Sequence, residues 1–197
     1  MKLNPDFIRA RLLRQPADEP VLSSTTAPQA AVLVLIYPGP SGPVTLLTLR
    51  SEHLPHHAGQ ISFPGGRVHP DDPSLEATAL RELVEETGID PSALVVLGRL
   101  PVTEVPSSGF VITPVVAWMD APPQFRPDPR EVAALIDCPL DIALEPASYR
   151  TGSLVRDGVT REFWYVEFDG HRVWGATARI LRSLALVLAG ADAVRAN

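Results

Sequence analysis

The chain has 197 residues, a net charge of −6 and a hydrophobic fraction of 45%, which fit one globular domain with a full-sized core. No apolar run approaches the roughly 20 residues that a membrane-spanning helix needs, and the acidic balance argues against a nucleic-acid-binding surface. The single cysteine, Cys138, excludes an internal disulfide and fits a reducing cytoplasm. We expect a cytoplasmic protein in which Cys138 is a small buried residue rather than a reactive thiol.

The N-terminal part of the chain divides into a helix and a linker. Residues 5–14 are predicted to form a short amphipathic helix, and the polar, proline-containing stretch that follows is interpreted as a linker. We therefore place the helix and linker in residues 1–29 and the main domain in residues 30–190. The oligomeric state cannot be inferred from these patterns.

The main domain is expected to begin with a hairpin. Residues 30–37 are a continuous apolar run that contains β-branched side chains, which is typical of a buried strand. A Gly/Pro-rich stretch over 39–43 interrupts the run, and residues 44–50 read as a second strand. Further on, Gly65 and Gly66 form a double-glycine loop, in which the backbone can approach a ligand closely.

A short helix is predicted over residues 73–87. Asp72 followed by Pro73 is a good helix start, because an acceptor at the N-cap precedes a proline in the first helical position. Gly88 is a good stop. The expected apolar face of this helix consists of Ala77, Leu80, Leu83, Val84 and Thr87.

Three carboxylates gather on the opposite part of this helix. The i, i+3 and i, i+4 steps from Glu82 place Glu85 and Glu86 beside it. Like charges at these spacings repel, and Arg81 pairs with Glu85 but cannot neutralise all three acids. A divalent cation such as Mg²⁺, which prefers oxygen ligands and bridges carboxylates to phosphates, can. The alternative is a solvated charged face.

The C-terminal half alternates strand and helix patterns. We expect two strands and then three helices, at residues 94–104, 110–119, 131–136, 141–148 and 177–189. Asp157-Gly158 and Asp169-Gly170 are hairpin turns, which predict a three-stranded meander over 153–174. This mixture predicts an α/β fold with a mixed sheet sandwiched between helices.

Several other residues are candidates for a binding site. Histidine suits zinc better than magnesium, so we interpret His53, His56 and His57 as loop residues facing substrate or solvent. Arg50 and Arg67 are candidates for diphosphate contacts, because a guanidinium grips phosphate oxygens in pairs; ordinary surface pairing is the alternative. The aromatic residues Trp164, Tyr165 and Trp174 are expected to pack in the core or hairpin rather than to form an adenine platform.

The segment from residue 66 to residue 89 resembles the Nudix box. The second half of the box fits at Arg81, Glu82, Leu83, Glu85, Glu86, Gly88 and Ile89. The first half departs from the pattern: Gly66 lies one residue farther from Arg81 than in the box, and Pro73 holds the place of the first glutamate, just after Asp71 and Asp72. We carry over no role from that glutamate.

A second resemblance points to one branch of this family. Residues 46–51, Leu54 and residues 57–66 look like the extra motif of the coenzyme A pyrophosphatase branch, which also tends to have a longer loop after the double glycine. The run over 173–181 is similar to the C-terminal end of that branch. Together the resemblance covers roughly residues 30–185.

This resemblance implies a Nudix-type α/β/α sandwich and an enzyme, with a small CoA-like nucleotide as substrate. The reaction would be metal-dependent hydrolysis of the diphosphate bond of coenzyme A or an acyl derivative, giving 3′,5′-ADP and 4′-phosphopantetheine or its acyl form. The cofactor would be Mg²⁺ or Mn²⁺, held by Glu82, Glu86 and Glu85. Glu85 is either a third ligand or the base that positions the attacking water, and Arg81 orients the carboxylates.

Substrate contacts are expected from Arg50, Arg67, Gly65 and Gly66. Glu131 is either an extra metal ligand from a loop across the cleft, as several Nudix proteins have, or a surface glutamate. The alternatives are hydrolysis of another nucleoside diphosphate derivative such as ADP-ribose, or a non-catalytic nucleotide-sensing module. The intact glutamates of the second half favour an enzyme, and the altered first half keeps the sensing module open.

Overall fold

A computed structural model of the chain describes residues 3–15, 27–54, 57–106, 108–156 and 158–191. Its helices are α1 (Pro5–Leu12), α2 (Leu75–Thr87), α3 (Leu140–Ala143) and α4 (Gly175–Ala189), with 3-10 turns at Pro91–Ala93 and Pro146–Ser148. Its strands are β1 (Gln29–Gly39), β2 (Gly42–Arg50), β3 (Ile61–Ser62), β4 (Gly65–Arg67), β5 (Val95–Arg99), β6 (Thr103–Val105), β7 (Phe110–Trp118), β8 (Val132–Pro139), β9 (Tyr149–Arg156), β10 (Val159–Phe168) and β11 (His171–Trp174).

Strand β1 organises the larger sheet. It pairs antiparallel with β2, as the predicted hairpin requires, and antiparallel with the short strand β4. It also pairs in parallel with β7 along most of its length, so the sheet is mixed. Strands β3 and β8 extend the sheet from β2, while β5 and β6 extend it from β7.

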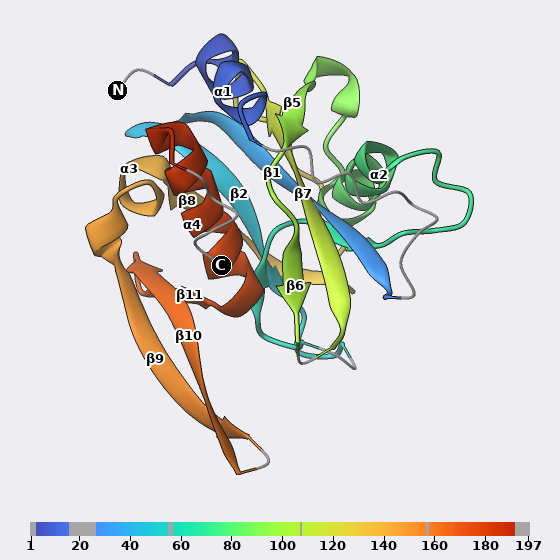
Figure 1. Ribbon diagram of the computed structural model, residues 1–197. Coiled ribbons are helices and arrows are strands. Elements are labelled where there is room, and N and C mark those ends of the chain that lie inside the picture. The colour runs from blue at the N-terminus through green and yellow to red at the C-terminus, as the bar shows by residue number, and fades with distance from the viewer. Residues whose placement is uncertain (1–2, 16–26, 55–56, 107, 157, 192–197) are drawn as a thin grey trace.

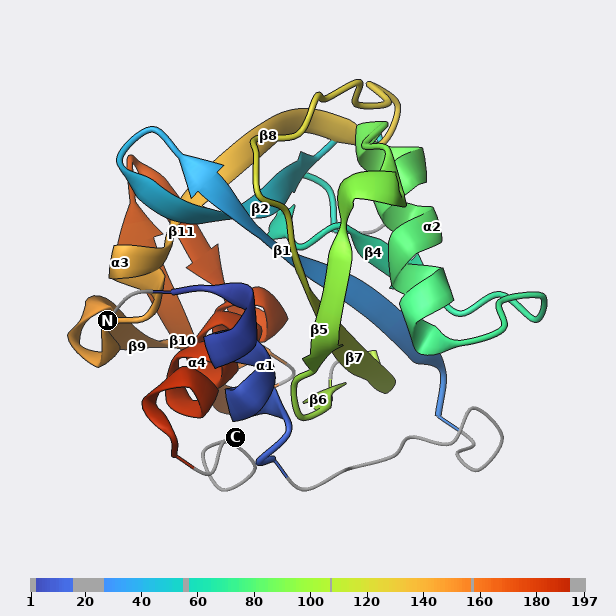
Figure 2. The same cartoon turned by 90° about the horizontal axis from the view of Figure 1, so that it is seen from above.

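Helices cover both faces of this sheet. Side chains alternate along β1: Val34 and Ile36 lie in one buried cluster, whereas Leu33 and Leu35 lie in another. Helices α1 and α4 pack on the first cluster and α2 packs on the second, so the sheet lies between them (Figures 1 and 2). The predicted α/β/α sandwich with a mixed sheet is confirmed.

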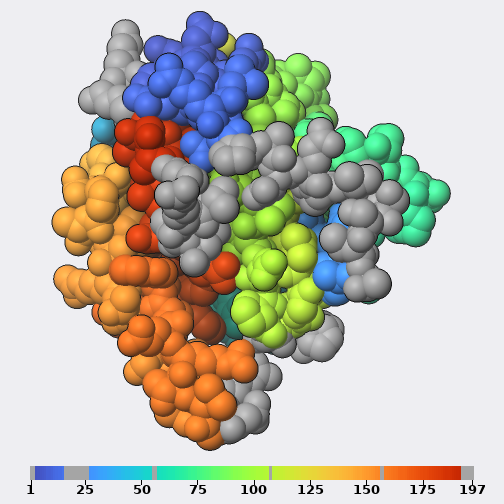
Figure 3. Space-filling view, viewed as in Figure 1, coloured from blue at the N-terminus to red at the C-terminus, as the bar shows by residue number. Residues whose placement is uncertain are grey.

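The second sheet consists of β9, β10 and β11 and confirms the predicted meander, which begins at Tyr149 rather than residue 153. Its β9–β10 hairpin projects from the body of the molecule (Figures 1 and 3). Asp169 and Gly170 have φ angles of 47° and 77°, as a tight hairpin turn of this kind requires. The rings of Phe163 and Trp174 pack 5.5 Å apart, and Arg182 of α4 lies 4.5 Å from the centre of the Trp164 ring. The aromatic residues therefore pack within the meander and against α4, as expected.

Three predicted elements differ from the structure. Residues 131–136 are not a helix, because Val132–Pro139 form strand β8 beside β2. The strand expected over 94–104 is two strands, β5 and β6, separated at Leu100 and Pro101; proline has no N–H for the sheet. The helix expected over 141–148 is short and starts at Leu140, and a separate 3-10 turn follows it.

The N-terminal helix is confirmed over Pro5–Leu12. Its Ile8 and Leu12 are buried in the cluster that α4 also covers. Most of the expected linker lies outside the described residues, so the division at residue 29 stays a prediction. Among the described residues, no helix is long and apolar enough to cross a bilayer.

Candidate active site

Helix α2 begins and ends at well-defined residues. Its N-cap is Ser74, whose Oγ accepts a hydrogen bond from the N–H of Ala77 at 3.2 Å, so the predicted cap at Asp72 and Pro73 is wrong. The carboxylate of Asp72 has other partners, described below. Gly88 ends the helix in the left-handed conformation, with φ 67°, as predicted. Fixed ends set the rotation of the helix and therefore the direction of its acids.

The buried face of α2 differs in detail from the expected one. Leu83 and Thr87 are fully buried as predicted, but Val84 is 40% exposed and Ala77 is only half-buried. Leu75 and Ala79 fill the core instead. The whole helix is rotated so that Glu86 also faces inward.

Glu86 is the most buried of the three acids, with a side chain 2% exposed. Its Oε2 has no hydrogen-bond partner among the described residues, and its Oε1 lies 3.9 Å from a terminal guanidinium nitrogen of Arg50. Burial raises the pKa of Glu86 to about 8, although Arg50 and the nearby backbone N–H of Gly65 favour the charged form. A buried carboxylate oxygen without a partner is costly, and a bound cation would satisfy it.

Glu82 lies beside the double glycine. Its side chain is 15% exposed and accepts a hydrogen bond of 2.8 Å from Arg81. Burial raises its pKa, Arg81 opposes that rise, and the charges of Glu85 and Glu131 add to it. A Cβ atom on Gly66 would lie 2.5 Å from the Glu82 carboxyl atoms. A larger residue at position 66 is therefore incompatible with this position of the carboxylate.

Glu85 differs from the other two acids, because its side chain is 54% exposed. It accepts a hydrogen bond of 3.1 Å from the same Arg81 nitrogen that holds Glu82. Over the described residues, no three acidic, histidine or cysteine side chains converge into a ready metal cage. The candidate metal ligands are nevertheless all carboxylate oxygens. Such ligands suit a hard cation that keeps several waters and substrate oxygens in its coordination shell.

Arg81 lies at the centre of a hydrogen-bond network. Its Nε and Nη2 donate to the two carboxylate oxygens of Asp72, each at 3.0 Å. Nη2 also donates to the backbone oxygen of Arg67 at 3.2 Å, while Nη1 donates to Glu82 and Glu85. The sequence did not identify Asp72 as a partner, although its position next to Pro73 in an altered box was a signal.

The loop after β7 is hydrogen-bonded to the C-terminal end of α2. The N–H of Arg126 donates to the carbonyl of Thr87 at 2.8 Å, and the N–H of Asp128 donates to the carbonyl of Glu86 at 3.1 Å. The loop leads to Glu131, an exposed residue whose charge raises the pKa of both Glu82 and Glu86. The structure therefore brings Glu131 near the acids of α2, from a different part of the chain.

Arg67 follows the double glycine in the chain, and Arg50 lies beside Glu86, which the N–H of Gly65 also approaches. Arg50 ends β2, and its Nε is buried without a hydrogen-bond partner among the described residues. Arg67 ends β4, is exposed, and places its guanidinium 5.9 Å from the centre of the Phe110 ring. Gly65 and Gly66 pair with β1.

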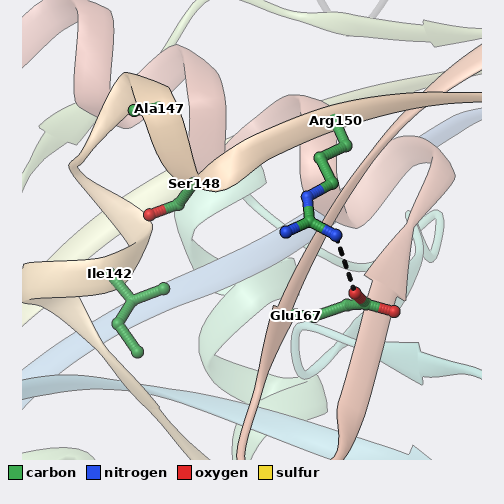
Figure 4. Close-up of a pocket in the computed structure, with 5 residues that line it drawn as sticks. All are labelled: Ile142, Ala147, Ser148, Arg150 and Glu167. Carbon is green, nitrogen blue, oxygen red and sulfur yellow. Dashed lines mark ion pairs between the residues drawn. The ribbon is translucent and has the colours of Figure 1, made fainter.

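The histidines do not form a metal cluster within the described part of the loop. His57 has its Nδ1 2.9 Å from the side-chain oxygen of Gln60, and His53 is exposed. His56 lies outside the described residues. A separate pocket contains none of the predicted site residues; it is lined by Ile142, Ala147, Ser148, Arg150 and Glu167 (Figure 4).

The family model described as "NUDIX domain" matches residues 27–157. Over 186 residues the chain is 40% identical to proteins named uncharacterized Nudix hydrolase NudL from Yersinia pestis (strain Pestoides F) and Yersinia pseudotuberculosis (serotype O:1b), covering 91% of this chain and 92% of each relative.

Among solved structures, the Nudix hydrolase RenU from M. smegmatis matches with a TM-score of 0.49 and 27% identity, over 57% of this chain and 71% of that chain. Because the family model and the two Yersinia relatives match most of the chain, including the acids of α2, the chain belongs to the Nudix hydrolase family, whose members act on pyrophosphate bonds.

Proposed function

We propose that this Nudix hydrolase cleaves the diphosphate bond of coenzyme A or an acyl derivative, giving 3′,5′-ADP and 4′-phosphopantetheine or its acyl form, with Mg²⁺ or Mn²⁺. One observation carries the metal dependence: the buried carboxylate of Glu86 has an oxygen without a partner among the described residues and lies next to Glu82 on one helix. A hard cation, which takes carboxylate oxygens as ligands, would satisfy this oxygen.

The three acids of α2 have different roles in this proposal, and the roles follow the exposure of their side chains. Glu86 and Glu82, which are mostly buried, hold the cation, and the more exposed Glu85 either completes the set or positions water. A bound cation would neutralise the negative charge of the diphosphate and would lower the pKa of a water molecule bound to it. Arg81 sets the directions of Glu82 and Glu85 through its two hydrogen bonds. Glu131 reaches the same region from the loop after β7 and is the remaining candidate for a base or ligand.

The diphosphate would lie along β4 and the end of β2. Gly65 and Gly66 carry no side chain that would keep a phosphate from the backbone. Arg67 follows these glycines in the chain, and a guanidinium such as that of Arg67 or Arg50 can donate two hydrogen bonds to phosphate oxygens at once. Arg50 also lies 3.9 Å from Glu86, so it can contact the substrate and the acidic site together.

The choice of coenzyme A rests on the sequence around this site. The motif over residues 46–51, Leu54 and residues 57–66 resembles that of the coenzyme A pyrophosphatase branch, and its described residues include the end of β2, all of β3 and the start of β4. Coenzyme A differs from simpler nucleotide diphosphates by a 3′-phosphate and a pantetheine arm. Binding energy from those parts can support the reaction at the diphosphate, so a selective enzyme should lose turnover when they are removed.

The decisive experiment measures kcat/KM for coenzyme A, dephospho-coenzyme A, ADP-ribose and a dinucleotide side by side, with Mg²⁺ and with Mn²⁺. We expect coenzyme A to be the best substrate and dephospho-coenzyme A to fall between it and ADP-ribose. Mass spectrometry should identify 3′,5′-ADP as a product. The Glu86→Gln variant, measured at the same protein concentration, controls for contaminating hydrolases.

Each outcome has a distinct meaning. A higher kcat/KM for ADP-ribose would reject coenzyme A as the substrate but leave the diphosphate chemistry in place. Tight binding of coenzyme A without turnover, with either metal, would favour the nucleotide-sensing module. Turnover that is unaffected by a chelator would reject the metal site.

A further inference from the structure

Arg81 has no hydrogen-bond donor left for a substrate. A guanidinium carries five N–H donors, and all five are used here. Nε and one N–H of Nη2 donate to Asp72, the second N–H of Nη2 donates to the backbone of Arg67, and the two of Nη1 donate to Glu82 and Glu85. The side chain therefore connects parts of the protein to one another.

Asp72 holds one end of the Arg81 side chain in place. Its side chain is only 8% exposed. Besides the two bonds from Arg81, it accepts hydrogen bonds from the backbone N–H of His69 at 2.9 Å and the hydroxyl of Thr78 at 2.8 Å. The hydrogen bonds from Arg81 hold the pKa of Asp72 well below its ordinary value. With both oxygens occupied, Asp72 fixes one end of the guanidinium.

The neighbouring acid provides a natural comparison. Asp71 is 91% exposed and its carboxylate lies 3.4 Å from His69, with no bond to Arg81 among those found in the described residues. Counted back from Arg81, the box position of the first glutamate falls on Pro73, which cannot bind a cation or an arginine through its side chain; counted forward from Gly66, it falls on Asp72. Among these three consecutive residues, Asp72 is the one that faces Arg81.

We propose that Asp72 is a positioning residue for the metal site, acting through Arg81 on Glu82 and Glu85. This inference rests on the proposed function, because it assumes that these glutamates bind a cation. Without Asp72, the positive end of Arg81 would be held mainly by the two glutamates and would compete with the cation for them. The carboxylates would also lose their fixed direction, and such supporting contacts commonly change metal affinity by about 10- to 100-fold.

The test measures Mn²⁺ binding directly, by electron paramagnetic resonance of free Mn²⁺, in the parent chain and in Asp72→Asn. We expect the variant to bind Mn²⁺ roughly 10-fold more weakly. The matched control is Asp71→Asn, which removes the same charge from the same loop and should bind within about 2-fold of the parent. Asp72→Glu keeps the charge and should recover part of the affinity.

Steady-state kinetics, on samples that circular dichroism shows to be as folded as the parent, provide a second readout. In Asp72→Asn, kcat at a fixed Mn²⁺ concentration should fall while the KM for coenzyme A stays near that of the parent, because the substrate contacts are untouched. Excess Mn²⁺ should restore part of kcat. If Asp72→Asn does not fold, Arg81→Lys replaces it, because an ammonium cannot span Asp72 and both glutamates.

The outcomes separate this inference from the proposed function. A folded Asp72→Asn or Arg81→Lys variant with the Mn²⁺ affinity of the parent would overturn the role of Asp72 and leave the proposed function intact. A parent chain that binds no Mn²⁺ would overturn both. An equal loss of affinity in Asp71→Asn and Asp72→Asn would overturn the inference, because it would reflect the charge of the loop alone.

Discussion

The carboxylate of Glu82 lies against the backbone of Gly66, so close that a Cβ on the glycine would be 2.5 Å from its three carboxyl atoms. The absence of a side chain on Gly66 thus allows the acid to approach the loop that we assign to the diphosphate. The neighbouring glycine has a different role: a Cβ on Gly65 would lie 2.5 Å from the backbone oxygen of Ala31, inside the sheet.

Gly66→Ala should lower activity without unfolding the protein. The added methyl group would meet the end of a movable side chain, so Glu82 would shift away from its present position. We expect kcat to fall by at least about 10-fold, as displacement of a catalytic group commonly causes, and Tm to change little. Circular dichroism and steady-state kinetics on the same sample check this.

Gly65→Ala is the contrasting variant, because Gly65 has φ 155° and its Cβ would meet backbone rather than a flexible side chain. This substitution should destabilise the fold by about 1–3 kcal/mol, measured by urea unfolding. Equal losses of stability in the two variants would contradict the separate roles of these glycines.

Glu86→Gln and Glu82→Gln should each reduce turnover by at least about 100-fold, because the amide removes the negative charge that a cation needs while keeping the shape. The fold should persist, since Glu86 Oε2 has no hydrogen-bond partner among the described residues to lose. Near-ultraviolet circular dichroism checks the fold, and initial rates with saturating Mg²⁺ check turnover. Rates within a few-fold of the parent for both variants would reject the metal assignment.

The ion pair between Glu76 and Arg99 should make stability depend on pH. Arg99 donates to both Glu76 oxygens, at 2.6 and 2.7 Å, and these bonds lower the pKa of Glu76. A carboxyl whose pKa is lower in the folded state stabilises the fold above its unfolded pKa of about 4.3. That stabilisation is lost as the pH falls through the lower, folded value.

We therefore expect Glu76→Gln to destabilise the chain at pH 7 by about 0.5–1 kcal/mol, a modest value because both side chains are partly exposed. The difference from the parent should shrink as the pH falls below about 4. Urea unfolding at several pH values measures it. In an Arg99→Gln background the pH-dependent part should disappear, and a difference that stays constant with pH would argue against the pair.

Cys138 should be unreactive in the folded protein. It is fully buried, and burial raises the pKa of its thiol to about 12, which leaves almost no thiolate at neutral pH. A thiol reagent should modify it at a rate limited by unfolding, and rapidly in denaturant. Rapid modification of the native chain would show that the residue is accessible after all.

Sequence patterns predicted the arrangement of these residues best where it depends on a single helix. The spacing of Glu82, Glu85 and Glu86 and the stop at Gly88 lie within one helix, and the structure keeps them on one side. The helix start was mispredicted because the preferred N-cap residue, Asp72, is held by Arg81, and Ser74 caps the helix instead. Local patterns did not reveal that competition.

Strand β8 was also mispredicted, because local sequence patterns do not show which distant segment a residue will pair with. Ala133, Ala134 and Leu135 favour a helix by propensity, yet the segment pairs with β2, and its Val132, Ile136 and Cys138 are buried. Pairing with a strand formed much earlier in the chain outweighs the local preference. The nearness of Glu131 to Glu82 and Glu86 follows from that pairing, so its position could not be predicted from its neighbours in sequence.

The pairing of β4 with β1 has a consequence for motion. Arg67, Gly66 and Gly65 lie opposite Ala30, Ala31 and Val32 on a strand that runs through the centre of the sheet. Local opening of the glycines would have to break bonds to this central strand, so their exchange with solvent should be as slow as that of the core. The entropy of ordering them is already included in the free energy of folding. A substrate bound over these glycines, as we propose, would therefore meet a rigid surface.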